Sequence, residues 1–195
     1  MLPGRTVVRI EAESAGFHLR TDKDVVAARK LVIACGLGIT PLAASLGMDV
    51  PVRPVRGQML ITERLPAFMP IPSSGVRQIT EGGVQIGTTM EDGLDEPATT
   101  VPDMARMAAR AATVIPALAS TRIVRAWAGV RPMTPDGCPV YAQSPHLPGA
   151  FAGVCHSGVT LCAVHATVLA KAILGGSLPD ETCDLQPERF HAQAA

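Results

Sequence analysis

The feature that most constrains this chain is a short apolar run that ends in glycine, Lys30-Leu31-Val32-Ile33-Ala34-Cys35-Gly36. A run of this length without polar alternation is typical of a strand buried on both faces of a parallel or mixed sheet. The next segment, 37–47, reads as a turn and a short helix that stops at Gly47. The sequence therefore predicts an α/β (mixed α+β) protein with a strand-to-helix turn at Gly36.

The segments on either side of this run have another pattern. Residues 7–13 and 17–22 alternate apolar and polar side chains, which predicts a hairpin. Residues 48–90 contain a strand at 56–63 and a second hairpin around Glu81-Gly82-Gly83, and so favour an antiparallel sheet. We interpret this change as the chain crossing from one sheet into another.

The second half of the chain returns to helical and then to apolar strand patterns. Helical spacing is expected at 100–118, with Thr100 as the N-cap. Its apolar stripe consists of Met104, Met107, Ala108, Ala111, Ile115 and Leu118. Strands are predicted at 122–134 and 150–154, and a helix that opens at Cys155-His156-Ser157-Gly158 is predicted to run to Gly175.

Composition excludes several classes of function. Basic and acidic residues both number 17, and aromatic residues make up only 3% of the chain. A balanced, aromatic-poor chain is a weak candidate for binding nucleic acid or an anionic membrane surface. The apolar stretch 159–174 contains His165 and Lys171, so no transmembrane segment is predicted.

Cysteine usage indicates the compartment. The five cysteines, at positions 35, 138, 155, 162 and 183, are odd in number and contain no CxxC pair. This pattern argues against a disulfide framework and favours a reducing compartment. The N-terminal segment also lacks the apolar core of a signal peptide, so we expect a cytoplasmic protein.

Two strand-to-helix junctions are candidates for binding a ligand. Gly36-Leu37-Gly38-Ile39-Thr40-Pro41 follows the buried strand, but Pro41 stands where a dinucleotide fingerprint has its third glycine. The junction 154–161 has small and polar residues that leave backbone N–H groups free at a helix start. Such a start favours an anion or an electron-rich carbonyl, although many similar junctions only cap a helix.

Other chemistry has weaker support. Arg131 is bracketed by Gly129 and Pro132 at the end of an apolar strand. The residues alone favour a surface or structural ion-pair arginine; the alternative is an arginine held on a rigid strand that binds a carboxylate with two parallel hydrogen bonds. Cys162 and His165 share a helix face, yet zinc is not expected, and the cysteines are interpreted as core residues. No GxSxG elbow is present, which argues against a serine hydrolase.

Four ordered stretches together resemble one family: KLVIACGLG, PVRPVRGQMLITE, RAWAGVRPMTPDGCPVY and AGVCHSGVTLCAVHATVLAKAILGG. It is the FAD-dependent D-amino-acid oxidase superfamily, which includes glycine oxidase, sarcosine oxidase and D-amino-acid dehydrogenases. Within it, RPMTPDGCPVY and CHSGVTL are most similar to the flavin subunits of D-hydroxyproline dehydrogenase and hydrogen cyanide synthase.

The resemblance implies two domains between which the chain passes more than once. Residues 1–47 would be a segment of a Rossmann-like FAD domain, containing the hairpin, the buried strand and the short helix. Residues 48–125 would form a mixed antiparallel substrate-domain sheet with a helix. Residues 126–195 would return to the FAD domain with the C-terminal helix and tail.

The resemblance also assigns residues to the site. Arg131 matches the arginine that binds the substrate carboxylate in the family. The resemblance also implies that the substrate is oxidised by hydride transfer to flavin N5. The cofactor-binding residues that it implies are Gly36, Gly129, Cys155, His156, Ser157, Gly158, Val159, Thr160 and Leu161. It implies no catalytic acid or base and no metal. Arg77 and Gln78 are expected either to line the pocket or to lie on a solvated strand face.

The chain departs from the family because it shows no N-terminal β-α-β unit with a full G-x-G-x-x-G. We therefore expect it to correspond to the C-terminal portion of an FAD-dependent amine or D-amino-acid dehydrogenase or oxidase. The alternative is a non-catalytic remnant, or one subunit of a split enzyme whose partner chain supplies the nucleotide-binding half or accepts electrons. An NAD-dependent Rossmann enzyme would rest on GLGITP alone.

Overall fold

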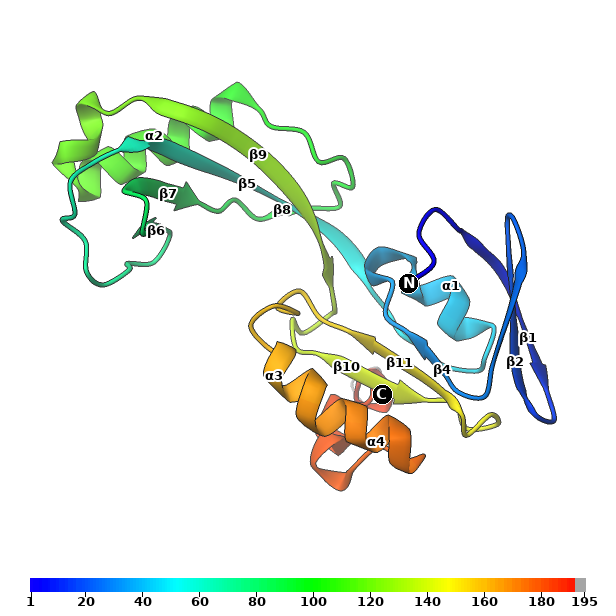
Figure 1. The fold of residues 1–195 in the computed structure, drawn as a ribbon. Helices are drawn as coiled ribbons and strands as arrows, with labels where there is room; N and C mark the ends of the chain where they lie inside the picture. Colours follow the sequence, from blue (N-terminus) through cyan, green and yellow to red (C-terminus); the bar gives the residue numbers. More distant parts are fainter. Residues whose placement is uncertain (192–195) are drawn as a thin grey trace. The chain divides into compact units, whose positions relative to one another are not determined.

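The chain passes from one compact unit into a second and back again (Figure 1). The structure is a computed structural model that describes residues 1–191. Unit 1 consists of Met1–Arg53 and Pro132–Ala195, and unit 2 of Pro54–Arg131. The division falls at 53/54 and 131/132, compared with the expected boundaries at 47/48 and 125/126.

Unit 1 contains two three-stranded sheets. The first is antiparallel, in the order β1 (Val7–Glu13), β2 (Gly16–Thr21) and β3 (Val25–Ala28), which confirms the predicted hairpin. The second has the order β10 (Val140–Gln143), β11 (Ala150–Val154) and β4 (Leu31–Ile33). Because β11 pairs antiparallel with β10 and parallel with β4, this is the mixed sheet that the apolar run predicted.

The core of unit 1 lies on one face of this mixed sheet. Leu31 and Ile33 pack there against Ile39 and Ala43 of the short helix α1 (Ile39–Ala44), which follows the 3₁₀ turn η1 (Gly36–Gly38). Burying an isoleucine such as Ile39 stabilises the fold by about 1.5–3 kcal/mol. Burial of β4 on both faces was a wrong prediction, because Val32 is 43% exposed on the other face.

The C-terminal helix of unit 1 begins later than predicted. Residues 156–161 form turns, and the helix runs through α3 (Cys162–Val164), a π-helical segment η3 (His165–Leu169) and α4 (Ala170–Gly175). Gly176 ends it at a φ of 96°, as a left-handed C-cap glycine does. The Lys30 ammonium donates to the carbonyls of Ile173 and Leu174 at 2.5 and 2.7 Å, which satisfies the free C-terminal end.

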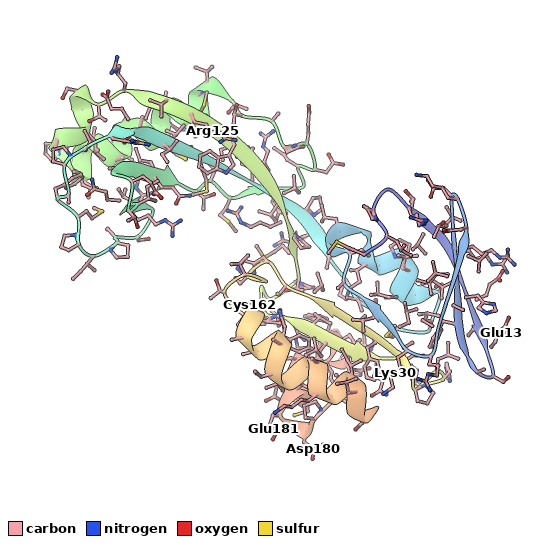
Figure 2. The ribbon with its side chains drawn as sticks, viewed as in Figure 1. Glu13, Lys30, Arg125, Cys162, Asp180 and Glu181 are labelled. Carbon is pink, nitrogen blue, oxygen red and sulfur yellow. The ribbon has the colours of Figure 1, made fainter. Side chains whose placement is uncertain are left out.

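On its outer side this helix exposes apolar side chains that no other part of the described chain covers. Val164, Val168 and Leu174 are 43, 42 and 78% exposed. Cys162 lies at its start (Figure 2) and is exposed, like Cys35, Cys138 and Cys183, while Cys155 is half-buried. The interpretation of the cysteines as core residues was therefore wrong. None of the described helices is both long and apolar enough to cross a membrane.

Two 3₁₀ segments follow, η4 (Asp180–Leu185) and η5 (Pro187–Phe190). Arg189 in η5 pairs with Asp136, in the turn that begins at Thr134, with Nε 2.8 Å from Oδ2 and Nη2 3.1 Å from Oδ1. This two-point ion pair connects the end of the described chain to the segment between β9 and β10.

Unit 2 is a five-stranded sheet with one helix packed on it. The order is β6 (Val76–Gln78), β7 (Gly83–Gly87), β5 (Arg53–Arg64) and β8 (Glu91–Asp92), and β9 (Ile123–Met133) also pairs with β5. The helix α2 (Val101–Val114) and the 3₁₀ turn η2 (Pro116–Ser120) lie against one face. All six residues of the predicted stripe pack in this core, with Leu60, Val84 and Ile86 of the sheet.

A polar network joins the sheet to the start of α2. Gln58 is fully buried, and its amide accepts from the backbone N–H of Thr100 at 2.7 Å and donates to Asp103 at 3.1 Å. Thr100 is the N-cap residue as predicted, but its hydroxyl bonds the Asp103 carboxylate instead of a backbone N–H. The first turn of α2 is thus held by a side chain of β5.

Candidate functional site

Arg131, the last residue of unit 2, lies across the neighbouring strand β5 at Gly57. A Cβ atom at Gly57 would stand 2.2 Å from Nη1 and 2.3 Å from Nη2 of Arg131, far closer than real contacts allow. Only glycine at this position leaves room for the guanidinium. Nη2 donates to Thr88 Oγ1 at 2.7 Å and Nη1 lies 3.4 Å from the Thr89 carbonyl oxygen, so the side chain has one defined direction.

The threonines that hold Arg131 are themselves fixed. Thr89 Oγ1 accepts from the backbone N–H of Gln58 at 2.9 Å and donates to the Glu91 carboxylate. Arg56 binds the same carboxylate at 2.5 Å, with both side chains largely buried. Burial alone would raise the pKa of Glu91, but the hydrogen bonds from Thr89, Arg56 and Gln58 lower it, so the group is a carboxylate.

Arg131 makes no ion pair with a carboxylate of residues 1–191. A guanidinium has five N–H donors, and the contacts to Thr88 and Thr89 use two of them. The Arg131 guanidinium is half-buried and its direction is fixed, but no carboxylate of residues 1–191 neutralises its charge. Such a group is suited to bind a carboxylate from outside the chain. The alternative of a structural ion pair has no partner in the described part of the protein.

Arg77 and Gln78, adjacent on β6, differ in role. Gln78 is structural: its Oε1 accepts from the backbone of Phe68 and Met69, and its Nε2 donates to the carbonyls of Leu65, Pro66 and Gly82. Arg77 is exposed, and its Nε donates to Gln85 Oε1 at 2.6 Å.

A cavity of about 290 Å³ opens in unit 1 beside the mixed sheet. It brings together Gly36, Cys155 and Gly158 of the expected site. Pro132, Tyr141 and His165 line it as well, with apolar walls from Val32, Ala34 and Leu169. The cavity thus joins the carboxyl ends of the parallel strands β4 and β11, which is where open α/β sheets bind ligands.

Gly36 and Gly158 keep this cavity open. Gly36 has a φ of 60°, in the left-handed region that favours glycine, and its nearest neighbour in the Cβ direction is Pro132 Cγ at 3.9 Å. A Cβ on Gly158 would come within 3.9 Å of Cys155 Sγ. A side chain at either position would occupy space that a bound group can use.

The loop after β11 presents unpaired donors. The Leu161 N–H bonds the Ser157 carbonyl at 3.0 Å, whereas the N–H groups of Gly158, Val159 and Thr160 donate to no protein acceptor within residues 1–191. Because they precede the helix that starts at Cys162, they favour an electron-rich or anionic group.

The remaining expected site residues do not line the cavity. On the loop itself, His156 and Thr160 are exposed, Val159 is 90% exposed, and Ser157 and Leu161 are half-buried. Gly129 lies exposed on β9 in unit 2, with no atom within 4 Å in its Cβ direction.

Sequence reasoning missed the pairing of Tyr141 with His165. Tyr141 Oη lies 2.8 Å from His165 Nε2, and the two rings meet edge to face with centroids 5.7 Å apart. Burial, with a smaller effect of the nearby Cys155 thiolate charge, raises the pKa of Tyr141. One signal was available, because Tyr141 is the single tyrosine of the chain. The sequence pattern suggests for His165 only a role as a metal ligand, and the described residues contain no cluster of metal-ligating side chains.

The chain is similar to known proteins over nearly its whole length. Residues 1–172 match the family described as FAD dependent oxidoreductase. The chain is 39% identical to one of the subunits of opine oxidase from Agrobacterium tumefaciens (strain Ach5), over 99% of this chain and 52% of that protein. It is 28% identical to the HcnC subunit of hydrogen cyanide synthase from Pseudomonas aeruginosa, over 100% of this chain and 49% of that one.

Solved structures agree with the fold. Glycine oxidase from Geobacillus kaustophilus superposes with a TM-score of 0.81 at 24% identity, over 93% of this chain and 51% of that one. L-proline dehydrogenase from P. horikoshii gives a TM-score of 0.84 at 21% identity, over 97% and 54%. The chain spans about half the length of the relatives that it matches. With the mixed sheet, the glycine-lined cavity and the match over residues 1–172, this chain belongs to the family of FAD-dependent oxidoreductases.

Proposed function

We propose that this chain forms the substrate-binding part, and one side of the flavin site, of an enzyme that oxidises an amine, amino acid or imino acid bearing a carboxylate. The observation that carries the proposal is the Arg131 guanidinium, laid over Gly57, held by Thr88 and Thr89, and free of any carboxylate of residues 1–191. Unit 2 would then be the substrate domain and unit 1 part of the FAD domain.

The residues of the unit 1 cavity fit the flavin end of FAD. Gly36 and Gly158 leave space for a flat ring system, and Val32 and Ala34 give it an apolar wall. The free N–H groups of residues 158–160 suit the electron-rich pyrimidine edge of such a ring. Cys155 would contribute its main chain, and we extend the assignment to His156, Ser157, Leu161 and Gly129 as neighbours of the cofactor. When bound, FAD supplies the acceptor for the hydride that leaves the substrate carbon.

The role of this chain is to bind and orient. Arg131 would hold the substrate carboxylate through two parallel N–H···O bonds, which fixes the position of the carbon next to it. A charge-assisted contact of this kind contributes about 1.5–3 kcal/mol. We assign no general base, because orientation is what the described side chains supply.

The names of the relatives bear on the partners. The relatives from opine oxidase and hydrogen cyanide synthase are, as their names say, subunits of those enzymes. We propose that this protein likewise works with a partner subunit that accepts electrons or completes the flavin site. A cytoplasmic location is supported by the four exposed free cysteines, which suit a reducing compartment.

A non-catalytic subunit is the alternative. It is favoured by the apolar side chains on the outer side of the C-terminal helix, such as Leu174 at 78% exposure, which a partner chain could cover. It predicts stable association with a partner but no flavin-dependent turnover.

The test is to measure FAD binding from the flavin absorbance spectrum. The protein is purified alone and together with a segment equivalent to the remaining half of a relative. We expect weak flavin retention alone and stoichiometric retention in the combined sample. Absence of flavin in both samples would contradict the proposal, and flavin binding without turnover of any amino carboxylate would favour the non-catalytic subunit.

The role of Arg131 is tested in the combined, flavin-loaded sample. Arg131→Ala is expected to raise KM for a carboxylate substrate about tenfold or more, in line with the loss of a charged hydrogen bond. Arg131→Lys keeps the charge but loses the fork, and is expected to recover only part of the loss. An unchanged KM in Arg131→Ala would remove Arg131 from the substrate site.

A further inference from the structure

Unit 2 has a pocket of about 350 Å³ between α2 and the strands β6 and β7. The second half of α2, the end of β7 and the turn that precedes β6 line it. Its volume is in the range of small-molecule sites, which is about 300–1,000 Å³. None of the residues that line it is acidic. The pocket is therefore large enough for a small ligand and carries no negative side chain that would repel an anion.

The pocket and the Arg131 guanidinium lie on opposite sides of the unit 2 sheet. Side chains alternate along a strand. Gln58 of β5 points toward α2, to which it is hydrogen-bonded, so its neighbour Gly57 faces the other way, with Arg131 over it. The pocket instead contains Met107 and Ala111 of α2, and Arg131 does not line it. A ligand in this pocket is therefore distinct from a substrate held by Arg131.

The inner wall of the pocket is apolar. Val76 of β6, Ile86 of β7 and Ala111 of α2 line it, and all three are buried members of the unit 2 core. Val114, at the end of α2, lines the same pocket but is 63% exposed. An aliphatic chain placed against these side chains would remove apolar surface from water, which favours binding in proportion to the area covered.

Arg110 of α2 brings a positive charge to the pocket. It is exposed and makes no hydrogen bond or ion pair with the described residues, 1–191. Arg106, one turn earlier on the same helix, differs in this respect because it is paired with Asp103. Since no carboxylate lines the pocket, the guanidinium of Arg110 is available to an anion from outside the chain.

The turn before β6 adds hydrogen-bond donors in fixed positions. Ser73 and Val76 exchange both backbone hydrogen bonds, at 2.9 and 3.1 Å, so Ser74 and Gly75 are the central residues of a tight turn. The backbone N–H groups of Ser74 and Gly75 and the Ser74 hydroxyl have no partner within residues 1–191. The Gly75 carbonyl accepts from the Gly87 N–H at 2.9 Å, which fixes this turn against β7.

We propose that this pocket is a second ligand site of the protein and that it binds an aliphatic monocarboxylate. The carboxylate accepts from Arg110 and from the donors of Ser74 and Gly75, and the aliphatic chain lies along the apolar wall. At about 30 Å³ for each water-sized group, a pocket of about 350 Å³ holds on the order of ten non-hydrogen atoms, which is the size of octanoate. The site does not depend on the proposed function, because it uses neither Arg131 nor the cavity of unit 1.

The experiment compares octanoate with octan-1-ol, which lacks the charge, and with butanoate, which lacks four methylenes. Kd for each is measured by ligand-observed NMR titration on the whole 195-residue protein. We expect octanoate to bind about tenfold more tightly than octan-1-ol, as a charged hydrogen bond contributes. It should exceed butanoate by about tenfold or more, because each buried methylene contributes about fourfold. Arg110→Gln should bring the Kd of octanoate close to that of octan-1-ol, and Arg110→Lys should give an intermediate value.

Arg106→Gln is the matched control. It removes the same charge from the same helix, at a residue that does not line the pocket. Octanoate should bind this variant as it binds the wild type, and far-UV circular dichroism should show the same fold in both arginine variants. An equal loss in Arg106→Gln and Arg110→Gln would reduce the effect to general charge and overturn the inference. Equal affinity of the wild type for octanoate and octan-1-ol, or no saturable binding of octanoate, would also overturn it.

Arg131→Gln separates this site from the substrate site. Thr88 lines the pocket, and its Oγ1 also accepts from Arg131 Nη2 at 2.7 Å, so a carboxylate bound by Arg131 has to be distinguished from one bound by Arg110. We expect Arg131→Gln to bind octanoate as the wild type does. A loss of octanoate affinity in Arg131→Gln with none in Arg110→Gln would place the carboxylate at Arg131 and overturn the second site, while the proposed function would stand.

Discussion

Replacing Gly57 by alanine tests whether the position of Arg131, and not only its charge, matters for the site. The new Cβ would stand 2.2 Å from Nη1, whereas ordinary contacts begin at 3.4 Å, so the guanidinium has to move by more than 1 Å. The Thr88 contact at 2.7 Å does not survive such a shift. A displacement of about 1 Å in a positioning group costs up to about 100-fold in rate.

Stability should respond much less than binding does. The atoms that clash belong to the far end of a flexible side chain, which can turn away from the strand. Alanine also restricts the unfolded chain more than glycine, which offsets about 0.4–1 kcal/mol. We therefore expect Gly57→Ala to change the free energy of unfolding by less than about 1 kcal/mol.

The assay combines two measurements on one preparation. Kd for N-methylglycine is measured by calorimetry, and the free energy of unfolding by urea denaturation. Gly57→Ala should weaken binding about tenfold or more, and Thr88→Val, which removes the hydroxyl acceptor, should weaken it less. Gly175→Ala, which has no atom within 4 Å in its Cβ direction, is the control for a glycine change in open space. Wild-type affinity in Gly57→Ala would refute the conclusion that the placement of Arg131 over Gly57 matters for binding.

Three further outcomes are expected. The hydrogen bond from Arg189 lowers the pKa of Asp136, so this carboxylate stabilises the fold above its unfolded pKa of about 4 and loses the effect as pH falls through the folded value. Asp136→Asn should therefore be less stable than wild type in urea at pH 7, with the difference disappearing at pH 2–3 (roughly, from the same linkage). Burial raises the pKa of Tyr141, the single tyrosine, so tyrosinate absorbance should develop only above about pH 10; a midpoint below that would contradict its burial. Burial also raises the pKa of the Cys155 thiol, so Cys155 should react with a disulfide reagent more slowly than the exposed Cys162, as peptide mapping would show.

Local patterns allowed most elements to be predicted. Alternation gave the hairpin of β1 and β2, and the stripe from Met104 to Leu118 gave α2 together with the face that it buries. These succeed because period and burial are properties of a few neighbouring residues. Arg131 could be singled out for the same reason, from its place between Gly129 and Pro132 at a strand end.

What could not be predicted depends on contacts distant in sequence. Nothing near Gly57 in the chain shows that Arg131 will lie over it, and nothing near Tyr141 points to His165. The exposure of Val32 was missed because an apolar run does not reveal whether both faces of its strand are covered. The late start of the C-terminal helix was missed because small polar residues suit a turn as well as a first helical turn.

The path of the chain through the two units has a practical consequence. Unit 2 is one continuous segment, Pro54–Arg131, whereas unit 1 is made of two separate pieces. The strands that carry the chain out and back, β5 and β9, are hydrogen-bonded neighbours. The ends of the inserted segment therefore leave side by side, so it can be excised as a single genetic cassette and replaced by that of a relative. If unit 2 is the substrate domain, as proposed above, grafting of this kind would transfer substrate preference while the two pieces of unit 1 stay as they are.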